Sequence, residues 1–280
     1  MTPAEARAAL ERLGAAGGEP PDLAEAALLF GVIDAPDADL AAARAHLAAL
    51  AAEAATLGGL SVEMRAAALA RLLAGTHGYA GDAETYDDLA NANLLRVIER
   101  RRGLPVALGI LWIHTARAAG WPAWGIDFPA HFLVAVEGET RAVAVDPFAR
   151  GHAPSPAELR AMVGRLVGEA AEIHPGLFRR MRDREVLLRL QNNIKIRRLR
   201  AGDLAGALAC LEDMLRLMPD AVPLWREAGL VHQRLGHKRA AIACLERFLS
   251  LHPGGEEALR VRATLNAIRA TLNAIRATLN

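Results

Sequence analysis

Apolar residues recur at helical intervals over most of the chain, and two short stretches near its middle break this rhythm. Residues 1–75, and much of the chain after residue 156, carry Ala and Leu at three- and four-residue steps. Residues 128–136 and 141–146 are short and apolar on both sides, which is typical of buried strands. The pattern therefore predicts an α+β fold: an N-terminal helical layer, a core with a small antiparallel sheet, and a helical C-terminal part.

Several helix boundaries in residues 1–75 are marked by capping residues. Thr2-Pro3-Ala4-Glu5 is a strong helix start, with Thr2 as the cap, Pro in the first turn and Glu three residues after the cap. The glycines and prolines of residues 14–21 predict the end of this first helix. Further helices are expected over about residues 21–32, 38–57 and 61–74. Ala-dense helices with polar faces favour a packing layer.

The C-terminal third repeats with a period of 34 residues, the period of the tetratricopeptide repeat. The pairs at this offset are Gly202 and Gly236, Ala207 and Ala241, Cys210 and Cys244, Leu211 and Leu245, Leu217 and Leu251, and Pro219 and Pro253. There is room for about two repeats, which we expect to pack on the preceding domain. Before them, helices are expected over Pro156–Val167 and Arg180–Leu190, around a break at 174–176.

The last nineteen residues, 262–280, repeat one heptad without change. Its apolar residues lie at alternating steps of three and four, which is the spacing of a coiled-coil stripe. They are Leu265, Ile268, Leu272, Ile275 and Leu279. Self-association through 262–280 is one interpretation, and a recent duplication or an added sequence is the other.

Composition narrows the classes of partner and compartment. The formal net charge of +1 gives no field that would steer the chain to nucleic acid or to an anionic membrane. No apolar run approaches the length of a membrane span. With two cysteines in 280 residues and no secretory leader pattern at the start, we expect a cytoplasmic protein.

Two polar residues stand in the apolar strands of the middle region, and a helix precedes them. The turn at 103–105 opens a helix expected over residues 106–119. His131 lies in the first expected strand and Asp146 ends the second, fifteen residues later. A hairpin that turns near Glu139 would bring the two side chains close enough for the carboxylate to orient the imidazole.

This region resembles the transglutaminase-like superfamily, in particular the bacterial SirB-type group that carries tetratricopeptide repeats behind the domain. The matching residues are Asn91, Leu94, Leu95 and Val97; Arg102-Gly103-Leu104-Pro105; Gly120-Trp121-Pro122; Pro129-Ala130-His131-Phe132-Leu133-Val134; and Asp146-Pro147-Phe148. The resemblance implies a papain-like core over 76–180, after a helical region (1–75) and before repeats (181–260) and a heptad tail (261–280).

The resemblance also assigns the site. In this superfamily a Cys nucleophile precedes a helix that ends in an Arg, a Gly and a Pro at set distances. Alignment on Arg117, Gly120 and Pro122 puts the Cys position at Pro105 and the family's His and Asp at His131 and Asp146. One departure is Ala130, where the group usually has Gly.

Proline at that position removes the expected chemistry, because its side chain cannot attack and it has no backbone N–H. Thr115 and Ser155 are the nearest hydroxyls by sequence. Cys210 and Cys244 occupy matching repeat positions, as core residues would. We therefore interpret the chain as a non-catalytic protein that binds a protein or peptide partner through its cleft and its repeats. The alternative is a hydrolase or acyltransferase in which His131 activates water.

The roles of the remaining polar residues stay open. His131 and Asp146 could form a structural pair, a ligand contact or a remnant of catalysis. Together with His152 and His174 they could supply metal ligands, but no short fixed spacing supports this, and we expect no metal or cofactor. The loop over residues 75–88, which holds both tyrosines, is either a surface loop or a border of the cleft.

Overall fold

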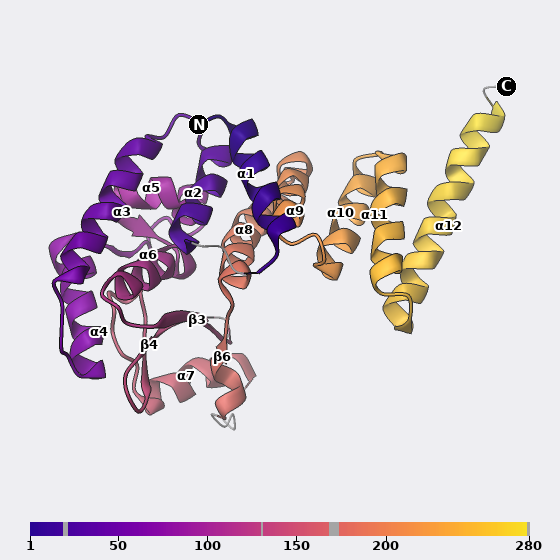
Figure 1. The fold of residues 1–280 in the computed structure, drawn as a ribbon. Helices are drawn as coiled ribbons and strands as arrows, with labels where there is room; N and C mark the ends of the chain where they lie inside the picture. Colours follow the sequence, from indigo (N-terminus) through magenta and orange to yellow (C-terminus); the bar gives the residue numbers. More distant parts are fainter. Residues whose placement is uncertain (19–21, 130, 168–173, 279–280) are drawn as a thin grey trace. The chain divides into compact units, whose positions relative to one another are not determined.

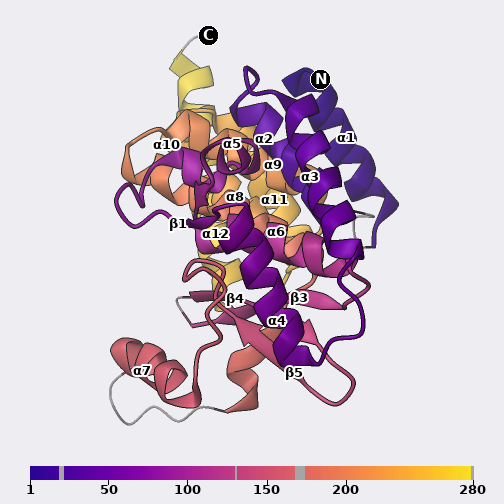
Figure 2. The same cartoon turned by 90° about the vertical axis from the view of Figure 1, so that its left-hand side faces the viewer.

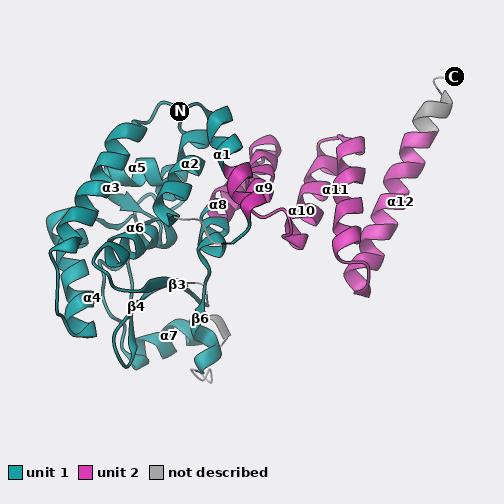
Figure 3. Ribbon diagram, viewed as in Figure 1, with its two compact units in different colours: residues 1–9, 17–190 teal, residues 10–16, 191–280 magenta. Residues whose placement is uncertain are grey.

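The computed structural model describes residues 1–18, 22–129, 131–167 and 174–278 (Figure 1). Its contacts divide the chain into two compact units (Figure 3). The first comprises residues 1–9 and 17–190, and the second comprises residues 10–16 and 191–280. The predicted α+β class is confirmed, with the sheet in the first unit and helical repeats in the second.

The N-terminal helices begin at side-chain caps. They are α1 (Pro3–Ala16), α2 (Leu23–Asp34), α3 (Leu40–Ala55) and α4 (Val62–Ala70), which continues as a π-helical turn over Arg71–Thr76. The capping box predicted at the first helix forms: the Glu5 N–H donates to Thr2 Oγ1 at 3.2 Å, and the Thr2 N–H donates to Glu5 Oε2 at 2.7 Å.

The first helix ends at Ala16, inside the break predicted over residues 14–21, and Gly14 itself lies within the helix. Gly14 is instead a point of close backbone contact within the second unit. A Cβ atom there would lie 1.9 Å from the carbonyl oxygen of Arg216. Glycine is therefore required at this position for packing and not for a turn.

An apolar helix lies at the centre of the first unit, and the second strand of a short parallel pair directly precedes it. The elements are β1 (Ala80–Gly81), α5 (Leu94–Arg100), β2 (Arg102–Gly103) and α6 (Pro105–Ala118), with a 3₁₀ turn at Leu89–Ala92. Strand β1 pairs with β2. Residues 106–113 of α6 are all buried, so this helix forms the middle of the core.

The sheet is antiparallel, in the order β5-β4-β3-β6. Its strands are β3 (Ala123–Phe128), β4 (His131–Glu137), β5 (Ala142–Val145) and β6 (Arg179–Arg180). The prediction of one continuous strand over residues 128–136 is therefore wrong at its start. Phe128 ends one strand and pairs with His131, which begins the next. The predicted turn at Gly138 forms, since the Gly138 N–H donates to the Arg141 carbonyl at 2.8 Å.

Helices cover both faces of this sheet (Figures 1 and 2). Gly109 of α6 allows close contact with Phe132 of β4, because a Cβ on Gly109 would lie 2.3 Å from that ring. On the other face, α7 (Pro156–Val167) packs Leu159 and Val163 against Leu133 and other strand residues. A 3₁₀ turn at Pro175–Phe178 then leads to β6.

The second unit is a row of helices with the predicted 34-residue period. They are α8 (Asp183–Arg200), which begins in the first unit, then α9 (Leu204–Leu217), α10 (Val222–Arg234), α11 (Lys238–Leu251) and α12 (Gly255–Thr278). The helix predicted over 180–190 starts later and runs ten residues further. Gly202 and Gly236 occupy equivalent turns, each with φ +77°. None of the described helices is both long and apolar enough to cross a lipid bilayer.

Candidate functional site

His131 and Asp146 meet across the hairpin of β4 and β5. His131 is the first residue of β4, and Asp146 directly follows β5. Because the strands pair with Val134 opposite Val145, the two residues lie on adjacent strand ends. His131 Nε2 lies 2.8 Å from Asp146 Oδ2. The imidazole is 23% exposed and the carboxylate 6%, so the histidine is the member of the pair that meets solvent.

The Asp146 carboxylate is held entirely by neighbouring groups. Its Oδ1 accepts the N–H groups of Phe148 at 2.9 Å and Ala149 at 3.2 Å, while Oδ2 receives His131. A carboxylate oxygen accepts hydrogen bonds, so we assign His131 Nε2 as the donor to Asp146, and Nδ1 lies on the other side of the ring. This is the arrangement by which a carboxylate orients an imidazole base.

Arg189 holds the backbone of His131, and sequence reasoning missed it. Its Nη2 donates to the His131 carbonyl at 2.8 Å, and its Nη1 pairs with Asp127. The guanidinium also lies over the Phe132 ring, 5.6 Å from the centroid. Arg189 is 58 residues from His131 in sequence, and no local motif marks it.

Pro105 is the first residue of α6. One turn further along the helix, the backbone of Gly109 lies against the ring of Phe132, which is the neighbour of His131 in sequence. The ribbon before Pro105 is tied to the Asp146 turn, because the Gly81 N–H donates to the Phe148 carbonyl at 3.0 Å. The start of α6 therefore packs in the same part of the first unit as the pair. Pro105 offers neither a nucleophile nor an N–H to this helix start.

The other candidate nucleophiles have structural surroundings. Thr115 is completely buried in α6, and its hydroxyl makes no hydrogen bond within the described residues. Ser155 caps α7 in a reciprocal box with Glu158. Cys210 and Cys244 belong to the second unit and are both buried. Burial also raises the pKa of the Cys244 thiol, which disfavours a reactive thiolate.

The two other histidines considered as metal ligands, His152 and His174, lie in local structural settings. His152 Nε2 lies 2.9 Å from a Glu158 oxygen, and its carbonyl accepts the Asp146 N–H at 2.7 Å. His174 precedes the 3₁₀ turn that begins at Pro175. In the part of the chain that the structure describes, no group of three or more His, Cys, Asp or Glu side chains is arranged to hold a metal ion.

The loop before α5 borders the Asp146 turn. The Tyr86 ring is 45% exposed and makes an edge contact with Phe148, with centroids 5.9 Å apart. Buried Asp82 fixes the loop, since it accepts the Thr85 hydroxyl at 2.6 Å and an Arg100 N–H at 3.1 Å. The exposed aromatic ring is thus held beside the turn that orients His131.

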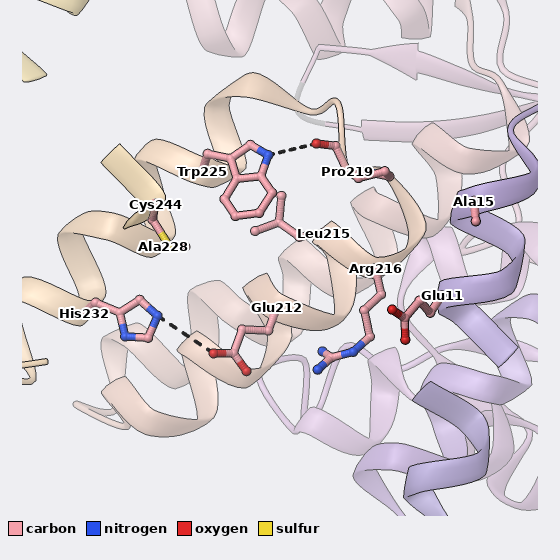
Figure 4. Close-up of a pocket in the computed structure, with 10 residues that line it drawn as sticks. All are labelled: Glu11, Ala15, Glu212, Leu215, Arg216, Pro219, Trp225, Ala228, His232 and Cys244. Carbon is pink, nitrogen blue, oxygen red and sulfur yellow. Dashed lines mark hydrogen bonds and ion pairs between the residues drawn. The ribbon is translucent and has the colours of Figure 1, made fainter. Parts of the chain in front are cut away.

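The second unit contains a pocket of about 540 Å³, shown in Figure 4. Its walls come from residues 11 and 15 of α1 and from α9, α10 and α11. A separate hollow of about 470 Å³ is lined by α8, α9 and α10, through residues that include Leu199, Leu211 and Leu230. Both volumes lie within the range of about 300–1,000 Å³ that is usual for ligand sites.

Comparison with known proteins agrees with this architecture. Residues 41–192 match the transglutaminase-like superfamily, and residues 194–266 match the tetratricopeptide repeat. A UPF0162 protein of Xylella fastidiosa is 30% identical over 205 residues, which are 72% of this chain and 73% of that protein. A UPF0162 protein of Vibrio cholerae is 30% identical over 251 residues, which are 88% of this chain and 92% of that protein.

A eukaryotic protein shares a shorter segment. F-box only protein 21 of mouse is 27% identical over 124 residues, which are 41% of this chain and 19% of that protein. The bacterial matches, by contrast, extend over most of both chains. With a matched core, matched repeats and these bacterial relatives, the chain belongs to the transglutaminase-like superfamily, in the bacterial UPF0162 (SirB-type) group with C-terminal tetratricopeptide repeats.

Proposed function

We propose that this protein is a non-catalytic member of its superfamily that binds a protein or peptide partner through the His131 side of its core and through its helical repeats. The observation that carries the proposal is the combination of Pro105 at the start of α6 with a His131–Asp146 pair still held at 2.8 Å. The base and its orienting carboxylate are present, while the position of the attacking atom is filled by a ring that cannot attack.

The exposure of the site supports a ligand role over a purely structural one. A buried imidazole–carboxylate pair would serve to fix two strands. Here the carboxylate is buried and the imidazole is partly open to solvent. Tyr86, exposed on a braced loop beside the same turn, adds an aromatic contact surface.

The repeats supply a second surface for a partner. Tetratricopeptide arrays stack helix pairs into extended surfaces that bind other proteins. In this chain α8 to α11 carry two hollows that a peptide could enter. The segment shared with F-box only protein 21 occupies 19% of that longer protein, which is consistent with a domain that works in association with other protein parts.

The non-catalytic proposal is tested by turnover assays with libraries of amides, esters and peptides. We expect no turnover above that of a His131→Ala variant. Turnover that disappears in His131→Ala would overturn the proposal. It would favour instead a hydrolase or acyltransferase in which the His131 Nδ1 lone pair takes a proton from water, an alternative that the oriented imidazole allows.

The assignment of Pro105 to the nucleophile position is tested by a Pro105→Cys variant. If residue 105 occupies the nucleophile position, a thiol there lies at a helix start near His131 and is expected to ionise readily. We expect a thiol-directed acylating probe to label it, and labelling to fall when His131→Ala is added. The wild-type chain, with only buried Cys210 and Cys244, supplies the background. If the thiol introduced by Pro105→Cys is inert, Pro105 does not occupy the ancestral site.

We also propose weak self-association through residues 262–280. The first part of the heptad stripe is already used inside the second unit, because Leu265 and Ile268 pack with Phe248 and Leu245 of α11. Leu272 is half-buried, and the side chains of Ile275 and Leu279 lie outside the described residues. The contact available to a second copy is therefore shorter than the sequence repeat.

A further inference from the structure

The pocket of the second unit has an apolar floor with one fixed aromatic ring. Trp225 of α10 lines it together with Leu215 of α9 and Ala228 of α10 (Figure 4). The Trp225 indole N–H donates to the Pro219 carbonyl at 2.8 Å, which fixes the orientation of the ring. A rigid aromatic wall beside aliphatic groups favours a large apolar side chain as the occupant.

The charged groups that line the pocket leave it negative. Glu11 lies on the α1 side and is exposed, and Glu212 on α9 has a side chain that is 46% exposed. The guanidinium of Arg216 is matched by Asp213, whose Oδ1 accepts its N–H at 2.8 Å and whose side chain is 5% exposed. Since the charge of Arg216 is balanced within the protein, the two glutamates set the sign of the pocket.

His232 does not offset these carboxylates at neutral pH. Its side chain is only 10% exposed, with Nε2 at 3.8 Å from Glu212 Oε1. Burial lowers the pKa of His232, and the neighbouring His237 lowers it further, against the opposing effect of Glu212. At neutral pH the Glu212 carboxylate, which lines the pocket, therefore faces an uncharged imidazole, to which a dashed line joins it in Figure 4.

The part of α1 that lines the pocket is closely packed against the second unit. Leu10 is completely buried, and Gly14 brings the α1 backbone against the end of α9. The pocket is thus formed before a ligand arrives, which lowers the entropic cost of binding.

Resting on the function proposed above, we infer that this pocket binds a peptide segment of a partner protein that presents a large apolar side chain next to a lysine or arginine. The apolar side chain packs against Trp225 and Leu215, and the basic group reaches Glu212 and Glu11. The volume of about 540 Å³ accommodates two neighbouring side chains and the backbone between them.

Three labelled eight-residue peptides test the chemistry on the full chain by fluorescence anisotropy. One alternates Leu and Lys, the second Leu and Glu, and the third Ser and Lys. We expect the first to bind at least about ten-fold more tightly than either of the others, because it alone supplies both the apolar and the basic group. Equal binding of the Leu–Glu or Ser–Lys peptide would overturn the inference.

Charge reversal tests whether the peptide binds in this pocket. In the double variant Glu11→Lys, Glu212→Lys we expect affinity for the Leu–Lys peptide to fall at least about ten-fold. The matched control is Glu256→Lys, a 79% exposed glutamate of α12 in the same unit, for which we expect less than about a two-fold change. Circular dichroism checks that each variant is folded. Equal losses in both variants would show non-specific attraction and exclude the pocket.

Thiol alkylation reports occupancy inside the pocket. Cys244 lines the pocket, whereas Cys210, the equivalent residue of the preceding repeat, does not. We expect the Leu–Lys peptide to slow alkylation of Cys244 and leave Cys210 unchanged, as followed by peptide mass mapping. Binding that is lost in His131→Ala and leaves Cys244 unprotected would keep the proposed function and reject this pocket. Protection of Cys244 without added peptide, lost when residues 269–280 are deleted, would identify the tail of a second copy as the occupant and overturn the partner assignment.

Discussion

The core site and the repeat pocket each pair an imidazole with a carboxylate, but they expose opposite members. In the core, the Asp146 carboxylate is 6% exposed, the His131 imidazole is 23% exposed, and the two lie 2.8 Å apart. In the pocket, the His232 imidazole is 10% exposed, the Glu212 carboxylate is 46% exposed, and the separation is 3.8 Å. The core pair therefore exposes its imidazole to solvent, and the pocket pair exposes its carboxylate.

The difference follows from how each carboxylate is satisfied. Asp146 receives two backbone N–H groups and His131, so its hydrogen bonds all serve the fold. Glu212 makes a longer contact with a histidine whose pKa is lowered by burial, and its charge remains available to a ligand. A carboxylate that holds the structure and one that meets a ligand therefore differ in burial and in bonding, although both stand beside a histidine.

The largest expected effect comes from removing each carboxylate in turn. Asp146→Ala leaves the Phe148, Ala149 and His131 donors without an acceptor, and we expect the free energy of unfolding to fall by about 3 kcal/mol. Glu212→Ala is expected to change it by less than about 0.5 kcal/mol, as for an exposed residue. Urea unfolding at pH 7 measures both. Asp146→Asn, which keeps an acceptor, is the control and should lose less than Asp146→Ala. Similar losses for Asp146→Ala and Glu212→Ala would remove the distinction between the two sites.

A second prediction concerns how the pocket is built. Gly14→Ala places a methyl group 1.9 Å from a backbone oxygen of Arg216, which cannot move as a side-chain tip can. We expect the free energy of local opening of residues 10–16 to fall by about 2 kcal/mol. The loss cannot exceed the free energy that it takes to release residues 10–16 from α9. Amide hydrogen exchange over residues 10–16 measures it. Gly254→Ala, with no atom within 4 Å of the new Cβ, is the matched control, and equal protection in both variants would refute the close contact.

The contact between His131 and Asp146 was predicted from sequence, whereas the pocket was not, and the reason is the sequence separation of the residues involved. His131 and Asp146 lie fifteen residues apart on one hairpin, so strand pattern and family resemblance together located both. Arg189 acts from 58 residues away, and nothing in its local sequence marks it. The 34-residue period gave the helices of the repeats, but the pocket depends on α1, which lies almost two hundred residues earlier in the chain.

Two residues show what local pattern leaves out. Gly14 was counted among the residues that end the first helix, yet it lies inside the helix and permits close packing. Strand β3 went unrecognised because Gly125 and Asp127 interrupt its apolar pattern. In the fold, Gly125 faces the Phe132 ring, and Asp127 pairs with Arg179 at 2.8 Å. Only the tertiary partners explain these residues.

The pH dependence of stability gives a third prediction. The pKa of His232 is lowered by burial, so below about pH 6.5 the unfolded chain takes up a proton that the folded chain does not. The contribution of His232 to stability is therefore expected to fall as the pH drops from 7 to 5. His46, whose pKa is lowered to about 4 by burial and by the Arg101 charge, contributes with the same sign.

The His232 contribution is isolated by comparing the wild type with His232→Gln. We expect the wild type to lose more stability than the variant between pH 7 and pH 5, as measured by urea unfolding at each pH. The His46 contribution cancels in this difference because both proteins retain it. A larger loss in the variant would mean that His232 gains a proton on folding, and the exposed carboxylate of the pocket would then face a cation.

The smallest expected effect concerns the tail. Since Leu265 and Ile268 are packed against α11, only Leu272 and the residues after it remain for a second copy, and fewer than three heptads form a weak coiled coil. Arg269 and Arg276 add no complementary charge, because residues 262–280 contain no acidic side chain. We therefore expect a monomer at about 10 μM and, near about 1 mM, a small rise in mass that disappears when residues 269–280 are deleted. Sedimentation equilibrium measures this. A dimer that is stable at the lower concentration and survives the deletion would place self-association elsewhere on the chain and leave the tail as an extension of α12 that packs only within its own unit.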